Sequence, residues 1–314
     1  MTKTGVGVGD VARAFRHGRE AAAQHMRRAD EVGFSWHEET VTDLLLTRVG
    51  RTVFTRTFSK REEGKNGADW VWWWVDESGT CFGMLSQAKR LKKKPSSRWW
   101  IDFGYDKGEQ RRKLMRTADG LDVPPMYILY FGTPEYRLPM TCGLRPHPRR
   151  CRKCERKTVS ILPALMTEPG GIGEDAAVAF DLSVPLEDIP DPRVSLGQLY
   201  DLNIPQMIPE LRAFFTQPQS GAARVAKLLT APLSQVRGGQ FSLDTAIPAR
   251  LTDDHAFPDV PGDSGHLGVP YLRHILRGLR TKPPHYVEQL LADPMEEIDV
   301  PAMESLDGIT VVRV

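Results

Sequence analysis

The sequence predicts an α/β protein in which a central mixed β-sheet is flanked by helices. Trp70 to Val75 is an aromatic and β-branched run, and Met126 to Phe131 is a continuous apolar run, as expected for buried strands. Segments with helical spacing of apolar residues precede, separate and follow these runs. Strands that alternate with helices in this way are typical of an α/β core.

The length of 314 residues is enough for one large domain or two modest ones. We expect an N-terminal helical segment (1–34), a core (35–140), a basic Cys/His element (141–160) and a less regular C-terminal region (161–314). The charged fraction is 26%, the start of the chain is polar, and no apolar run is long enough to span a membrane. These features predict a cytoplasmic protein that does not bind membranes.

Two helices and a strand are expected before the centre of the core. Residues 10–31 carry apolar side chains at loosely helical spacing, with Asp10 as the N-cap. Ser35 to Val49 forms the second helix, with Glu38 and Glu39 in its first turn. Residues 52–60 alternate enough to predict a strand.

A predicted hairpin follows, and it carries the residues with the most informative chemistry. Trp70 to Val75 and Thr80 to Ala88 are its two strands, joined by a short polar turn. Asp69 precedes the first strand. Gln87 and Lys89 lie two residues apart near the end of the second, so both project from one face, on which Asp69 could meet them.

A carboxylate, an amide and a lysine together suit the hydrolysis of a phosphodiester. That reaction needs a hard cation such as magnesium on the phosphate oxygens, an activated water and a positive charge near the developing negative charge. Asp69 would hold the metal, Gln87 would complete the site or position a water, and Lys89 would orient the nucleophile or stabilise the transition state. A capped turn and a solvated strand end are the alternative interpretation of the same residues.

Four stretches give this pattern a wider context: His37 to Leu46, Phe58 to Trp73, Gln87 to Leu91, and Gly108-Glu109-Gln110 at the start of a helix. Together they resemble the PD-(D/E)xK nuclease superfamily, which has the restriction-endonuclease-like fold. The likeness is to variants with a QxK signature and, more narrowly, to a family of uncharacterised bacterial proteins with this core. It covers about Trp36 to Gly132.

The resemblance implies that Asp69, Gln87 and Lys89 are catalytic, with Glu38 or Glu39 as the helix acid. It implies Mg²⁺ or Mn²⁺ bound by Asp69 and Gln87, and a DNA endonuclease of bacterial defence or restriction. Double-stranded DNA and a homodimer are the implied partners. A further alternative is a subunit whose nuclease is switched on by a defence partner protein or an activating nucleotide. Gln87 removes one metal-binding charge, so weaker metal binding, a single-metal mechanism and an inactive relic all stay open.

A second candidate site is the run Cys142-x4-His147-x3-Cys151-x2-Cys154. Four such ligands within thirteen residues fit a tetrahedral structural Zn²⁺. The alternative is a basic loop with incidental cysteines. Bound zinc would fix an arginine-rich loop beside the core, as a clamp on the substrate.

The net charge of +2 hides a basic middle and an acidic end. Basic residues that suit a phosphate backbone are Lys92, Lys93, Lys94, Arg149, Arg150, Arg152 and Lys153. A solvated face is the alternative for each charge run. Beyond Thr158, helices are expected near 207–215, 222–229, 271–279 and 286–291, in a region for specificity, regulation or partner binding. A catalytically silent or partner-activated nucleic-acid-binding subunit is the alternative function.

Overall fold

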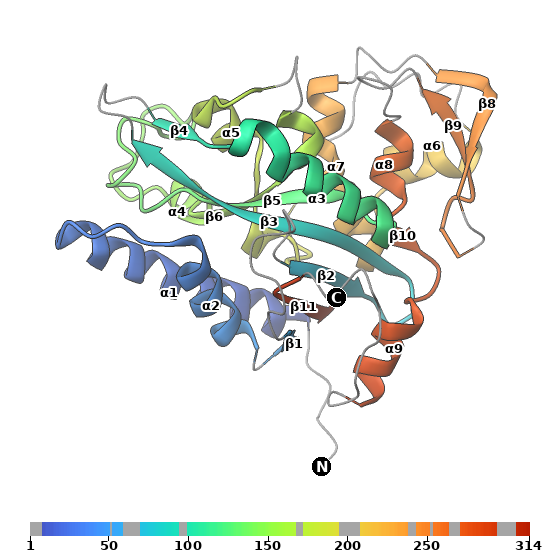
Figure 1. Ribbon diagram of the computed structural model, residues 1–314, viewed down its shortest axis with the longest axis horizontal. Coiled ribbons are helices and arrows are strands. Elements are labelled where there is room, and N and C mark those ends of the chain that lie inside the picture. The colour runs from blue at the N-terminus through green and yellow to red at the C-terminus, as the bar shows by residue number, and fades with distance from the viewer. Residues whose placement is uncertain are drawn as a thin grey trace.

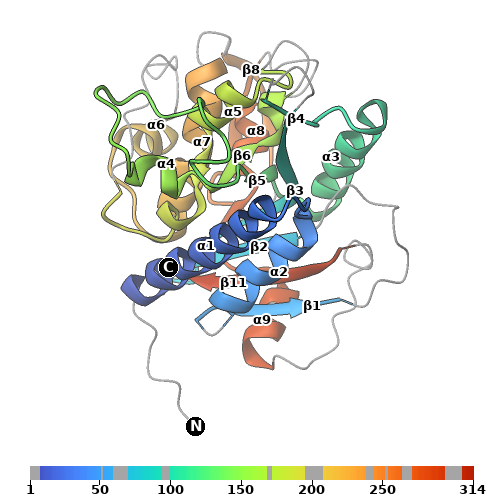
Figure 2. The ribbon, with the colours of Figure 1, turned by 90° about the vertical axis from the view of Figure 1, so that its left-hand side faces the viewer.

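The computed structural model describes residues 8–50, 52–58, 70–93, 99–167, 172–194, 208–237, 243–251, 254–263, 271–293 and 306–314. In these ranges the chain forms one nine-stranded sheet with helices on both faces, and a small two-stranded sheet (Figures 1 and 2). The predicted mixed central sheet flanked by helices is therefore confirmed. No helix within the described ranges is long and apolar enough to cross a membrane.

The first half of the chain supplies most of the sheet. Its elements are α1 (Val8–Glu31), α2 (Glu38–Val49), β1 (Phe54–Thr57), β2 (Trp70–Val75), β3 (Cys81–Lys93), β4 (Trp99–Ile101), the 3-10 turn η1 (Asp106–Gly108), α3 (Glu109–Leu121) and β5 (Pro125–Tyr130).

The second half adds helices and the remaining strands. Up to residue 188 these are α4 (Arg152–Arg156), β6 (Val159–Pro163), η2 (Ala164–Thr167), α5 (Ala176–Leu182), β7 (Val184–Pro185) and η3 (Leu186–Asp188). The later elements are α6 (Pro209–Thr216), α7 (Gly221–Arg237), β8 (Leu243–Arg250), β9 (Asp259–Asp263), α8 (Tyr271–Leu276), β10 (Leu279–Arg280), α9 (His285–Ala292) and β11 (Gly308–Arg313).

The sheet has the order β1-β11-β2-β3-β5-β6-β7, and β4 and β10 pair with the two ends of β3. β11 is parallel to β2 and β3 is parallel to β5, whereas the other pairs are antiparallel. The antiparallel β2 and β3 are the predicted hairpin, and α3 is the crossover that a parallel β3–β5 pair requires.

The alternation of side chains along β2 fixes which helices cover which face. Trp72 and Trp74 pack against Phe15 of α1, with ring centroids 6.3 and 5.6 Å apart. Trp73 points to the other face and donates a hydrogen bond of 3.0 Å to the Tyr286 hydroxyl on α9. All six residues of β2 are buried, as the sequence predicts for a strand covered on both faces. Figure 1 shows α1 and α2 on one side of β3 and α3 on the other.

Several predicted boundaries differ from the structure. β3 continues to Lys93 instead of ending at Ala88, because β4 pairs with its last three residues. Asp10 is not the N-cap of the first helix. It lies inside the first turn of α1, where its carboxylate is 3.4 Å from the Arg13 guanidinium. The predicted strand over 52–60 is limited to β1 in the described residues.

The largest difference is the place of β11, for which the sequence raised no expectation. This strand lies between β1 and β2, so the sheet draws strands from beyond the predicted core of 35–140. Its first residue, Gly308, sits under the Trp70 ring, and a Cβ there would overlap both that ring and the carbonyl oxygen of Arg56. Only glycine fits this position without displacing its neighbours.

We therefore expect Gly308→Ala to destabilise the protein by about 1–3 kcal/mol through overpacking. Urea unfolding followed by tryptophan fluorescence would measure the change. The matched control is Gly120→Ala in α3, where nothing lies within 4 Å of the added methyl group. There alanine should be neutral or stabilising by up to about 1 kcal/mol. Equal stability of the two variants would contradict the tight packing of β11 on β2.

Candidate functional site

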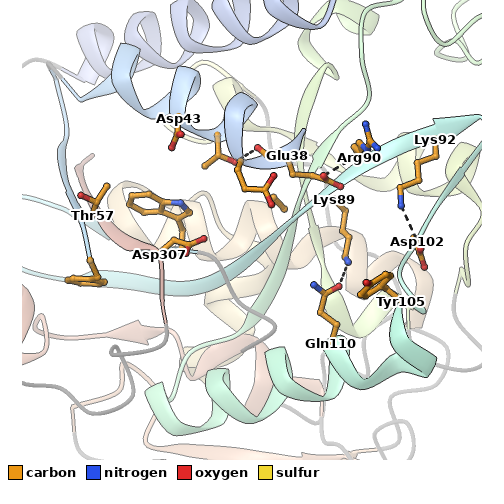
Figure 3. Close-up of a pocket in the computed structure, with 15 residues that line it drawn as sticks. Glu38, Asp43, Thr57, Lys89, Arg90, Lys92, Asp102, Tyr105, Gln110 and Asp307 are labelled. Carbon is orange, nitrogen blue, oxygen red and sulfur yellow. Dashed lines mark hydrogen bonds and ion pairs between the residues drawn. The ribbon is translucent and has the colours of Figure 1, made fainter. Parts of the chain in front are cut away.

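A pocket of about 530 Å³ lies where β2 begins and β3 runs on past it (Figure 3). Its charged lining residues are Glu38, Glu39, Asp43, Asp102, Asp307, Lys89, Arg90 and Lys92. The other lining residues are Thr42, Thr57, Phe58, Trp70, Ala88, Tyr105 and Gln110. The pocket thus receives side chains from α2, from β3, from the start of α3 and from the residue that precedes β11.

Lys89 reaches this pocket from the α3 face of the sheet. Its side chain is only 8% exposed, its ammonium group donates a hydrogen bond to Oε1 of Gln110, and it lies 5.8 Å from the centroid of the Tyr105 ring. Asp106 and Lys107 of η1 have positive φ angles of 50° and 51°. This left-handed turn ends directly before α3 and brings Tyr105 and Gln110 to the same ammonium group.

Glu38 lies on the opposite face, with α2. Its carboxylate is 3.9 Å from Nε of Arg90, and the same guanidinium donates a hydrogen bond to the carbonyl oxygen of Trp36. Arg90 follows Lys89 in β3, so the two cations project to different faces. Glu39 is exposed at the start of α2. The two candidate helix acids and Lys89 therefore reach the pocket from opposite sides of β3, as Figure 3 shows for Glu38.

Gln87 shares the face of Lys89 but is almost fully buried, at 1% exposure, and does not line the pocket. Asp69 and Lys94 lie outside the described residues. The structure thus places two of the three central predicted residues on one face, in agreement with their spacing of two along β3. It leaves the predicted catalytic roles of all of them as predictions.

Two of the lysines predicted to contact nucleic acid are held against tryptophan rings. Lys92 lies 5.3 Å from the Trp100 ring centroid and 3.7 Å from the Asp102 carboxylate. Lys93 lies 5.6 Å from the Trp99 ring centroid. These cation–π contacts keep both charges beside β4, at the end of β3 that we call the β3–β4 rim, and Lys92 lines the pocket.

The predicted Cys/His element converges on one point. The ligand atoms of Cys142, His147, Cys151 and Cys154 all lie within 4.8 Å of one another, with Cys142 Sγ 3.4 Å from Cys151 Sγ and His147 Nε2 3.2 Å from Cys154 Sγ. Tetrahedral ligands with Zn–S bonds of about 2.3 Å would be separated by about 3.7 Å. The four residues could therefore hold a metal ion such as zinc.

The thiols of this cluster differ in their readiness to ionise. Burial opposes ionisation of Cys142, but the Leu144 N–H and the thiols of Cys151 and Cys154 outweigh it and lower the pKa of Cys142. Burial raises the pKa of Cys154 to about 11. A thiolate at Cys142 would give a cation its first ligand, and coordination would then release the protons of the other thiols.

The Cys/His element is joined to the pocket through Arg137 and Tyr136. The buried Arg137 donates hydrogen bonds to the carbonyl oxygens of Gly132 and Cys154. The neighbouring Tyr136 hydroxyl donates to the carbonyl oxygen of Leu91 at 3.3 Å, and its ring lies 4.9 Å from that of Trp99. The cluster therefore braces the end of β3 that carries Lys89 and Arg90.

The basic residues of this element fall into two groups. Arg149, Arg150, Arg152 and Lys153 are exposed, as nucleic-acid contact would require. Two others in the same run point inward. The Arg156 guanidinium binds the carboxylates of Glu187 and Asp188, and the buried Lys157 ammonium donates to three backbone carbonyl groups around the end of α5.

Asp102, Tyr105 and Asp307 are among the pocket residues that sequence reasoning missed. Asp307 directly precedes the β-branched run of β11, and an acid at the start of a strand is the one signal that could have marked it. Nothing in the sequence shows that this strand lies beside β2. Among the side chains that the structure describes, the Cys/His cluster is the only group of three or more metal-ligating residues that converges.

Fold and site together define a mixed α/β protein with a charged pocket at the end of the sheet and a Cys3His cluster that could hold a metal ion. The chain matches the model of a family of unknown function (DUF6615) over residues 11–313, and it belongs to that family. No curated protein and no solved structure matches it.

Proposed function

We propose that this protein is a nuclease that hydrolyses phosphodiester bonds of DNA with Mg²⁺ or Mn²⁺. The observation that carries the proposal is the buried ammonium group of Lys89, which enters a pocket whose other walls bear carboxylates. A cation so placed suits the negative charge that develops on a phosphoryl group in its transition state. The resemblance to the PD-(D/E)xK superfamily and its restriction-endonuclease-like fold supports the same reaction.

The proposed role of Lys89 follows its position in the pocket, and the roles of Asp69, Gln87, Glu38 and Glu39 follow the resemblance. Lys89, held by Gln110 and the Tyr105 ring, orients the nucleophile or stabilises the transition state. Asp69 and Gln87 bind the divalent metal, and Glu38 or Glu39 adds an acid from α2. The metal would polarise a phosphate oxygen and lower the pKa of a bound water.

We propose double-stranded DNA as the substrate. Lys92 and Lys93 at the β3–β4 rim would contact its phosphate groups, together with the exposed arginines of the Cys/His element. Action in bacterial defence and a homodimer that cuts both strands are part of the proposal and rest on the resemblance alone. Control by a partner protein or a nucleotide through the C-terminal region is a further part of it.

The second candidate function is a nucleic-acid-binding subunit that is silent or waits for a partner. Two observations favour it. Gln87 stands where an acid would carry a charge, and no trio of acids converges among the described residues. Such a subunit would bind DNA with strong salt dependence and leave it uncut.

Cleavage of supercoiled plasmid by the purified protein, with and without Mg²⁺ or Mn²⁺, tests the proposal. We expect metal-dependent nicking or linearisation, and a rate at least about 100-fold lower in Lys89→Met, which keeps the length of the side chain but removes its charge. The matched control is Lys282→Ala, an exposed lysine paired with Asp254 away from the pocket. Salt-sensitive binding without cleavage in either metal would instead support the binding subunit.

For the Cys3His cluster we propose a structural zinc ion that holds the arginine-rich loop as a clamp on the substrate. We expect about one zinc per chain by atomic emission, and its loss in Cys154→Ser, together with a lower thermal unfolding midpoint. Cys81→Ala, at the opposite end of β3, should keep the zinc. A zinc-free wild-type protein with an unchanged midpoint after chelation would refute the structural zinc.

A further inference from the structure

Asp307, which directly precedes β11, and Gln87 of β3 occupy equivalent places on the two sides of β2. Gly308 of β11 pairs with Trp70, and Trp70 pairs with Ser86 of β3, so these three residues form one row across the sheet. Because β3 runs antiparallel to the other two strands, the residue after Ser86 and the residue before Gly308 step away from the row in the same direction. These residues are Gln87 and Asp307.

Because side chains alternate along each strand, Asp307 and Gln87 project from the same face of the sheet. Trp70 projects toward α1 and α2, as do Trp72 and Trp74. Residues one step from that row project to the opposite face, where Lys89 meets Gln110 of α3. Two strand spacings of about 4.8 Å separate the backbones of Asp307 and Gln87.

Asp307 is also held firmly at the pocket. Its carbonyl oxygen accepts a hydrogen bond of 2.9 Å from the Phe58 N–H, and the next residue, Gly308, is wedged against Trp70 and Arg56. Its side chain lines the pocket, and Figure 3 shows Asp307 and Lys89 on opposite sides of the open space. The backbone from which this side chain enters the pocket is therefore held in place.

The charges around the pocket explain what such a carboxylate would do. A hard divalent cation is bound by oxygen ligands, and its affinity rises with the number of ligand charges. Gln87 offers a neutral oxygen, and the Glu38 carboxylate lies beside Arg90 on the other face. An acid on the face of Gln87 and Lys89 would restore the charge that the glutamine lacks.

We propose that Asp307 is a ligand for the divalent cation of this pocket, supplied by the C-terminal strand in compensation for the neutral Gln87. This inference rests on the proposed nuclease function, which it deepens by adding a metal ligand. The cation is of the Mg²⁺ or Mn²⁺ class, since carboxylate and amide oxygens are its donors.

The test combines direct Mn²⁺ binding with cleavage, on full-length protein whose Cys/His cluster is intact. Free Mn²⁺ is measured by electron paramagnetic resonance during titration, for wild type, Asp307→Asn, Gln87→Glu/Asp307→Asn and the control Asp259→Asn. The control removes an equal charge from the exposed side of β9. Thermal unfolding without metal verifies that each variant folds.

We expect Asp307→Asn to raise the dissociation constant for Mn²⁺, and the Mn²⁺ concentration for half-maximal cleavage, at least tenfold. The added Gln87→Glu should recover most of this loss, because it returns a charge to the same row. Asp259→Asn should match the wild type. Recovery by a substitution on a different strand is a result that a merely structural role of Asp307 would not give.

The outcomes separate this inference from the nuclease proposal. Wild-type cleavage with unchanged Mn²⁺ binding and activity in Asp307→Asn would overturn the role of Asp307 and leave the nuclease intact. Mn²⁺ binding that needs Asp307, without cleavage of any DNA, would support the metal site and overturn the nuclease. A wild-type protein that neither binds Mn²⁺ nor cuts would overturn both.

Discussion

The pairing of β11 with β2 is the constraint on which the rest of the structure depends. It joins residues 308–313 to residues 70–75 in parallel register, and among the described strands β11 is the one that attaches β1 to the sheet. Parallel pairing between segments so far apart in sequence carries a large loop-closure cost, which burial of β11 and the tryptophans of β2 must offset. The pocket lies at the end of this same pairing, so packing of the core and geometry of the site are fixed together.

β3 separates two of the cationic side chains that line the pocket. Its alternate residues send Arg90 toward α2 and Lys89 toward α3, and each cation is positioned by groups on its own side. A buried ammonium group is costly to desolvate, and Lys89 at 8% exposure bears that cost beside an amide oxygen and an aromatic ring. A solvated strand end, the plainest interpretation of Lys89 from the sequence, does not describe this environment. Arg90 is half-buried, so the description as a solvated strand end does not apply to Arg90 either.

Features set by neighbouring residues could be predicted from the sequence, and those set by distant pairing could not. The burial of β2 follows from its run of tryptophan and valine, and the convergence of Cys142 and Cys154 follows from their spacing with His147 and Cys151. The common face of Gln87 and Lys89 follows from strand alternation alone. The position of Asp307 needs the register of β11 against β2, and the separation of Glu38 from Lys89 needs the side of the sheet on which α2 packs. Neither is encoded in a local pattern.

The place of β11 between β1 and β2 also has a consequence for synthesis of the chain. A ribosome releases α9 before the residues of β11, so a nascent chain can form the β2–β3 hairpin while the place between β1 and β2 is still empty. Until that place is filled, the open edge of β2, rich in tryptophan, is a template for pairing with other chains. A folding intermediate of this kind would expose that edge until β11 pairs with it, and a substitution in β11 would disturb both β1 and β2, since β11 lies between them.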